Sequence, residues 1–232
     1  MRLVFLLALL ALTVAAAVYG VRSGMIDVPP DWNPWEQLDV NAEPNFLTRY
    51  KLDRLSERAE QCQQVLATTD IEYQRLDNRV TGPACGFFNA VRVERTTSRV
   101  GKPFSLSCRT AVSLALWERH VLDPAAQRHF GQKVATLEHF GSYSCRNVYG
   151  RAQATRSQHA NAEALDVAGF VLEDGRRIRV LKDWEEDGAS GAFLREIRTG
   201  ACRFFDGVLS PNYNAAHRDH FHFDRGPYRV CR

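Results

Sequence analysis

The sequence has little net charge and no strongly biased region. Its 30 basic and 27 acidic residues leave a formal net charge of +3 at pH 7. It has neither a dense basic segment nor interleaved basic and aromatic residues, so nucleic-acid binding is not expected. Repeats and low-complexity tracts are also missing. A content of 45% hydrophobic and 25% charged residues is that of a folded globular protein, and it excludes a disordered, collagen-like or coiled-coil chain.

Only one long hydrophobic run occurs in the chain. It extends from Leu3 to Tyr19, and no charged residue follows it until Arg22. A run of this length suits the core of an export signal and is almost long enough to cross a bilayer. We therefore predict that residues 1–23 are a signal peptide or an N-terminal membrane anchor.

No two cysteines form a Cys-x-x-Cys pair, which argues against a thiolate zinc site and a thioredoxin motif. An even number of cysteines behind an export signal is typical of disulfides formed in a periplasm-like compartment. Oxidised cysteines also argue against a Cys–His peptidase, whose nucleophile must be a free thiolate. The pairing stays open, with a local link between Cys62 and Cys85 favoured. The other cysteines are Cys108, Cys145, Cys202 and Cys231.

The chain divides into a linker and one domain. Residues 24–46 hold four of the nine prolines and are predicted to be an extended linker, with Trp32 and Trp35 available to lie on the surface. Residues 47–232 are long enough for one hydrophobic core. Hydrophobic spacing predicts helices over 46–66, 107–121 (ended or redirected by Pro124) and 191–208, and strands over 90–93, 133–137, 164–172, 177–181 and 220–224. The predicted class is α+β, with a central antiparallel sheet and flanking helices.

Three of the seven histidines, His217, His220 and His222, fall within six positions. In a strand, residues two apart share a face, so His220 and His222 should point the same way. Two imidazoles on one face suit a core poorly, because each carries a nitrogen that needs a partner. They do suit metal ligation, or a ligand beside a general base. Upstream, His159 and Asp166 complete a donor set that fits a zinc ion with one position open for water.

These residues also carry a family resemblance. Ser157-x-His159…Asp166 followed by His217-x-x-His220-x-His222 resembles the zinc peptidases that include D-Ala-D-Ala carboxypeptidases and the penicillin-insensitive murein endopeptidase. Residues from about 62 to 224 resemble more specifically the bacterial extensin-like C-terminal domain, a relative of that group. The matching segments are Gly-Ser-Tyr-Ser-Cys-Arg (141–146), Arg-Ser-Gln-His-Ala (156–160), Ala-Leu-Asp-Val (164–167) and His-Arg-Asp-His-Phe-His (217–222). The resemblance implies a fold of the D-Ala-D-Ala metallopeptidase type.

By position, the resemblance implies that His159, Asp166 and His222 bind one zinc ion. His220 matches a histidine that assists catalysis without binding the metal. Arg146 matches an arginine that faces a substrate carboxylate or carbonyl in relatives, and Ser157 matches a residue that braces the site through a hydrogen bond.

Two departures from the family pattern bear on the substrate. His217 stands where carboxypeptidase relatives carry a glutamate base and where the murein endopeptidase carries histidine, which favours an endopeptidase. Ala162-Glu163 replace a glycine that relatives often have in the loop between His159 and Asp166, so the loop shape and substrate fit stay open. Tyr143 and Tyr213 are further candidates to line the cleft.

The combined prediction is a zinc-dependent peptidoglycan peptidase in the periplasm, cutting stem-peptide crosslinks and either anchored to the inner membrane or secreted. His220, with His217 behind it, would take the proton of the attacking water and stabilise the oxyanion. Arg146 would hold a stem carboxylate, because a guanidinium suits bidentate binding. The expected partners are peptidoglycan and, through the N-terminal segment, the inner membrane. The need for a protein activator is left open.

Two alternatives remain. The first is a serine triad, for which the residue types of Ser157, His159 and Asp166 would be suitable. However, no Gly-x-Ser-x-Gly elbow is present, and a triad would leave the histidines of 217–222 unexplained. The stronger alternative is a non-catalytic protein that binds the cell wall or scaffolds the envelope while keeping the fold. A chelator should abolish a metallopeptidase and leave either alternative working.

Overall fold

The computed structural model describes all residues from Met1 to Arg232. The α-helices are α1 (Arg2–Arg22), α2 (Phe46–Arg54), α3 (Ala59–Leu66), α4 (Cys108–Trp117), α5 (Asp123–Phe130), α6 (Val180–Asp183) and α7 (Ala189–Ala201). The strands are β1 (Glu72–Leu76), β2 (Arg79–Gly82), β3 (Cys85–Phe87), β4 (Ala90–Arg95), β5 (Arg99–Ser107), β6 (Val134–Gly141), β7 (Ala164–Leu172), β8 (Arg177–Arg179), β9 (Gly207–Leu209), β10 (Phe221–Asp224) and β11 (Val230–Cys231). Short helical turns are η1 (Pro30–Trp32), η2 (Glu118–Leu122), η3 (Val148–Gly150), η4 (Gln158–Asn161) and η5 (Ala215–His217).

One large sheet forms the centre of the molecule. It has nine strands in the order β1-β4-β5-β6-β7-β10-β9-β11, with β8 paired to β7. All neighbours are antiparallel except β5 with β6 and β9 with β11. The predicted α+β class, with a central mostly antiparallel sheet and flanking helices, is confirmed.

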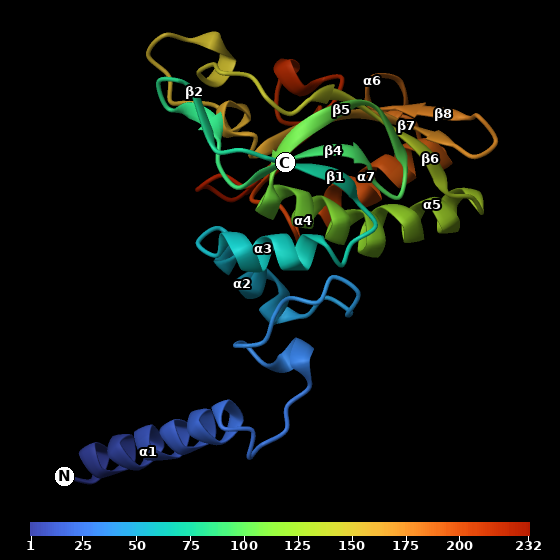
Figure 1. Ribbon diagram of the computed structural model, residues 1–232. Coiled ribbons are helices and arrows are strands. Elements are labelled where there is room, and N and C mark those ends of the chain that lie inside the picture. The colour runs from blue at the N-terminus through green and yellow to red at the C-terminus, as the bar shows by residue number, and fades with distance from the viewer.

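Helices α4, α5 and α7 cover one face of this sheet. Figure 1 shows α4 and α5 along one side, with α2 and α3 beyond them, and α1 standing apart from the domain. Aromatic side chains fill the layer between helices and sheet: the ring of Trp117 is 5.2 Å from that of Phe223, and Phe170 is 5.4 Å from Phe193. The opposite side of the sheet carries the segments around 143–160 and 210–220 (Figure 1).

The three predicted helices differ from the structure, and the strand predicted over 177–181 ends at Arg179, because α6 begins at Val180. The helix over 46–66 is two helices, because α2 ends at Arg54 and α3 begins at Ala59. The helix from 107 does not stop at Pro124 but runs through the π-helical turn η2 into α5. Proline lacks the N–H that an α-helix needs there, and a wider turn just before it relieves the clash with the preceding carbonyl. The helix over 191–208 ends at Ala201, since 207–209 forms β9 beside β10.

Part of the predicted linker is folded onto the domain. Leu38 and Val40 are buried in the main core, and the carbonyl of Val40 lies 2.8 Å from Nε2 of His120. Trp32 and Trp35 remain on the surface, 50% and 38% exposed. The packed part of the chain therefore begins before residue 47.

The predicted link between Cys62 and Cys85 is wrong. Cys62 pairs with Cys108, Cys85 with Cys145, and Cys202 with Cys231. Cys62 lies on α3, which packs on α4 and so faces Cys108, whereas Cys85 on β3 faces the loop after β6. Three disulfides, together with an apolar helix α1 long enough to cross a membrane, fit an extracytoplasmic protein.

Candidate metal centre

The pairing of β7 with β10 builds the centre. In this antiparallel pair Asp166 and His222 are directly opposite each other, which places both side chains on the same face. His159 enters from η4, whose start is capped by Ser157: the Ser157 hydroxyl accepts a hydrogen bond from the backbone N–H of His159 at 3.3 Å. Sheet register and a capped turn thus fix three side chains around one point.

Three donor atoms converge there. Nδ1 of His222 lies 3.0 Å from Oδ1 of Asp166, and Nε2 of His159 lies 3.2 Å from the same oxygen. The two imidazole nitrogens are 3.1 Å apart. Ligand atoms bonded at ~2.1 Å to a tetrahedral ion are separated by about 3.4 Å. His159, Asp166 and His222 could therefore hold a metal ion with little movement.

Both histidines have their second nitrogen occupied. Nδ1 of His159 lies 3.1 Å from the carbonyl oxygen of Ser142, and Nε2 of His222 lies 2.8 Å from Oδ2 of Asp224. If each of these nitrogens donates its proton, the nitrogen facing Asp166 carries a lone pair. Such partners fix the tautomer and ring orientation of metal-binding histidines.

The charges of the cluster are strongly coupled. Burial raises the pKa of Asp166, but hydrogen bonds from His159 and His222 outweigh it and hold this pKa well below its usual range. Burial also disfavours the charged form of His222, yet its hydrogen bonds to Asp166 and Asp224 raise its pKa to about 9. The cluster is thus a negative pocket that favours a cation, whether a proton or a metal ion.

Two more histidines border the cluster. Nε2 of His220 lies 3.6 Å from Oδ1 of Asp166, and its Nδ1 is 2.9 Å from a carboxylate oxygen of Asp219. His217 is buried, its ring 5.3 Å from that of His220, and its Nδ1 lies 2.8 Å from Oδ1 of Asn214. Burial, reinforced by the neighbouring histidines, lowers the pKa of His217 to about 4, so it is neutral at pH 7.

The cluster opens into a cleft of about 520 Å³. The predicted site residues Arg146, Ser157 and Tyr213 line it together with the four histidines and Asp166. Arg146 is exposed and its guanidinium forms no ion pair, so it is available to an anionic ligand. Tyr149 and Tyr228 also line the cleft, although nothing in their sequence context singles them out.

Tyr143 is not brought into this cleft. Its ring packs against Phe87 at 4.3 Å, its hydroxyl contacts Thr81, and it lines a neighbouring hollow between β5 and β6. The serine triad is not built either. The Ser157 hydroxyl bonds the backbone of His159, while the His159 ring faces Ser142, His222 and Asp166.

Sequence reasoning missed the residues that orient the histidines: Asp219, Asp224 and Asn214. A signal for one of them was present, because Asp224 is two residues beyond His222 in a strand and so shares its face. The role of Asn214 depends on the turn η5, whose start it caps by accepting from Ala216 N–H.

Comparison with known proteins gives one match. The family described as "Extensin-like protein C-terminus" matches residues 60–232, which include every residue of the candidate centre. No curated protein and no solved structure matches the chain. The match covers most of the chain, and the matched region folds as one sheet with its covering helices. The protein therefore belongs to the extensin-like C-terminus family.

Proposed function

We propose that this protein is a zinc-dependent peptidoglycan peptidase of the periplasm, with the fold type of the D-Ala-D-Ala metallopeptidases, and that it hydrolyses stem-peptide crosslinks. The observation that carries the proposal is the convergence of His159, Asp166 and His222 at 3.0 to 3.2 Å, with each imidazole held by a second partner. The motif resemblance to zinc peptidases of peptidoglycan supplies the substrate class.

The donor set suits zinc. Two imidazole nitrogens and one carboxylate oxygen are ligands that zinc accepts, and three protein ligands leave one position for water or substrate. A bound zinc ion supplies Lewis acidity to the scissile carbonyl and makes water a nucleophile at neutral pH.

Proton transfer, oxyanion stabilisation and substrate binding would be carried out by side chains of the protein. His220, oriented by Asp219, accepts the proton of the attacking water and returns it to the leaving amine. The neutral ring of His217 stands behind His220 and is held in place by its Nδ1–H, which donates to Asn214. Because this leaves only a lone pair on Nε2 of His217, His220 in its protonated form would stabilise the developing oxyanion. Arg146 at the cleft edge holds a carboxylate of the peptide stem.

The test is release of muropeptides from purified sacculi by the full chain in detergent. We expect muropeptide release with zinc, no release with a chelator, and no release by the His222→Ala variant. The masses of the products would identify the bond that is cut. His129→Gln is the matched control, because His129 pairs with Glu196 away from the cleft and should leave release unchanged.

Two results would count against the proposed peptidase activity. A folded His222→Ala protein that keeps both its zinc and its full activity would overturn the proposal. Wild-type protein that is folded, zinc-loaded and bound to sacculi but releases nothing would favour the non-catalytic wall-binding alternative.

A further inference from the structure

A group of exposed aromatic side chains follows directly after α1. Trp32 is 50% exposed, Phe46 73% and Tyr50 47%, and Trp35 is 38% exposed. We call these four residues the aromatic cluster. Apolar surface of this kind on a folded domain indicates a contact with a partner or a membrane.

Two sets of contacts hold the aromatic cluster together, one between rings and one through Arg54. The rings of Trp32 and Phe46 are 5.6 Å apart in an edge-to-face arrangement. The guanidinium of Arg54 lies 5.4 Å from the Tyr50 ring and donates a hydrogen bond to the Pro34 carbonyl. The segment 30–54, which carries these residues, lies on the side of the domain that faces α1 (Figure 1).

The aromatic cluster belongs to the domain rather than to a loose tether. The ammonium of Lys51 contacts the carbonyl oxygens of Pro30 and Gln37, and the Asn45 amide donates to the Asp31 carbonyl at 3.0 Å. Leu38, between the two tryptophans and Phe46, is buried in the core. The exposed rings therefore cannot move far from the domain surface.

The connection between α1 and this surface is short. The cap residue of α1 is Ser23 and η1 begins at Pro30, so only residues 24–29 lie between them. Six residues span at most ~21 Å when fully extended. Arg22, the last residue of α1, also lies 5.7 Å from the Trp35 ring. If α1 crosses a bilayer, the aromatic cluster must lie at or close to the surface of that bilayer.

We propose that the aromatic cluster inserts into the headgroup layer of the membrane that holds α1. Tryptophan and tyrosine favour this layer because each has an apolar ring and a polar atom. Asp31 and Glu36 balance the charges of Arg22 and Arg54 beside the rings, so there is no basic excess and insertion depends on the rings and not on anionic lipid. The domain is then held with its cleft turned away from the membrane, because the segments around the cleft lie beyond the sheet from α1 (Figure 1). This inference is independent of the proposed chemistry.

The test uses the full chain in single-copy nanodiscs of zwitterionic phosphatidylcholine, with bromine on the acyl chains close to the headgroups. The two remaining tryptophans, Trp117 and Trp184, are buried in the domain. We expect brominated lipid to quench the emission of the wild type, and the quenching to be lost in the double variant Trp32→Phe, Trp35→Phe.

A matched variant provides the control. Phe88 is 52% exposed beside β3, and Phe88→Trp in the double-variant background should give emission that bromine does not quench. Equal quenching of Phe88→Trp and wild type, or no difference between the wild type and the double variant, would overturn the proposal. The surface would be assigned to a second copy instead if bromine did not quench the emission in single-copy discs and if Trp32 and Trp35 became shielded only in discs that hold two copies. The proposal would also be overturned if the protein isolated from cells lacked residues 1–23, because α1 would then not hold the domain at the membrane.

Discussion

His222 and Asp166 lie directly opposite each other across β10 and β7, with Nδ1 and Oδ1 3.0 Å apart. One register position thus joins two candidate ligands that are 56 residues apart in the chain. Side chains alternate faces along a strand, so a slip of one residue would turn one of them away from the centre. The candidate metal centre therefore depends on the register of the sheet.

Asp224→Asn should weaken metal binding without unfolding the protein. Asp224 uses both carboxylate oxygens, Oδ2 for His222 and Oδ1 for the backbone N–H of Gly226. Asparagine has one acceptor oxygen, so one of the two partners is lost and the His222 ring is less well oriented. We expect zinc affinity to fall by about 10- to 100-fold, measured by competition with a chromogenic chelator.

The control for this variant is Asp174→Asn. Asp174 also accepts with both oxygens, from Arg176 N–H and the Gln132 amide, but in the turn between β7 and β8. Its replacement should leave zinc affinity unchanged. An equal loss of affinity in both variants would show that Asp224 has no special role.

Arg146→Ala should impair substrate binding and leave metal binding intact. A charged hydrogen bond to a carboxylate contributes ~1.5–3 kcal/mol, so kcat/KM on stem peptides should fall by about 10- to 100-fold. Because the contact is made to bound substrate as well as in the transition state, the loss should appear mainly in KM. Arg128→Ala is the control, since Arg128 pairs with Glu196 and does not line the cleft. Unchanged kinetics in Arg146→Ala would contradict the role.

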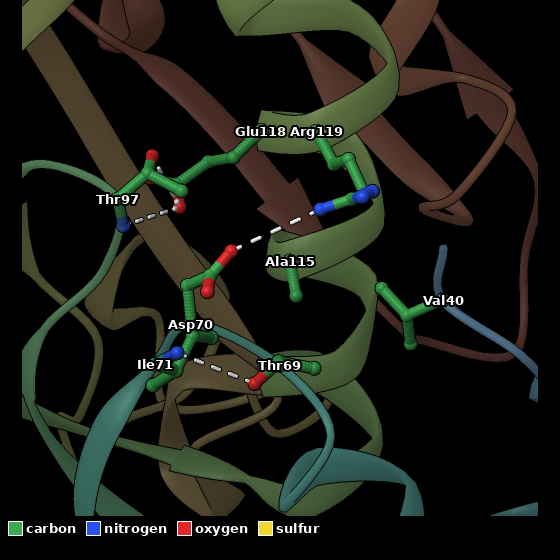
Figure 2. Close-up of a pocket in the computed structure, with 8 residues that line it drawn as sticks. All are labelled: Val40, Thr69, Asp70, Ile71, Thr97, Ala115, Glu118 and Arg119. Carbon is green, nitrogen blue, oxygen red and sulfur yellow. Dashed lines mark hydrogen bonds and ion pairs between the residues drawn. The ribbon is translucent and has the colours of Figure 1, made fainter.

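The stability of the protein should fall as the pH rises through neutrality, because of Glu118. Burial raises the pKa of this carboxyl to about 8, although hydrogen bonds from Thr96 and Thr97 partly oppose the shift. Figure 2 shows Glu118 beside a small cavity, with Arg119 turned toward Asp70 rather than toward Glu118. The nearby charge of Asp123 adds to the cost of ionising Glu118.

The sign of the effect follows from proton binding. A carboxyl with a raised folded-state pKa binds its proton more tightly in the folded protein. The free energy of unfolding therefore falls progressively as the pH rises from about 4.5 to 8. Glu118→Gln should remove this slope, which is at most ~1.4 kcal/mol per pH unit. Denaturant unfolding at several pH values measures it. Parallel pH profiles for wild type and Glu118→Gln would refute the assignment.

Removing the disulfide between Cys62 and Cys108 should be costly. Both cysteines are fully buried, and the bond closes a loop with a sequence separation of 46 residues. We expect the double variant Cys62→Ala, Cys108→Ala to lose ~4 kcal/mol of unfolding free energy, chiefly through the entropy of the unfolded chain. Peptide mapping under non-reducing conditions checks the pairing itself. A linked peptide containing Cys62 and Cys85 would contradict the structure.

The sequence by itself determined the elements whose spacing is local. The strand predicted over 164–172 is β7, and the turn at Asp174-Gly175 is the tip of a hairpin. The shared face of His220 and His222 follows from the period of a strand, and the structure places both beside Asp166. Short-range geometry sets these features, so residue pattern is enough to predict them.

Only the tertiary structure decided which distant residues meet. The disulfide partner of Cys62 depends on how α3 packs on α4, and the position of Tyr143 depends on its packing against Phe87. The contact of His159 with His222, which is 63 residues away, and the contact of His159 with the Ser142 carbonyl depend on sheet register and on a capped turn. Burial of Leu38 and Val40 likewise comes from contacts with the helical layer. Such contacts reflect the free energy of the whole packed core, which no local pattern of residues encodes.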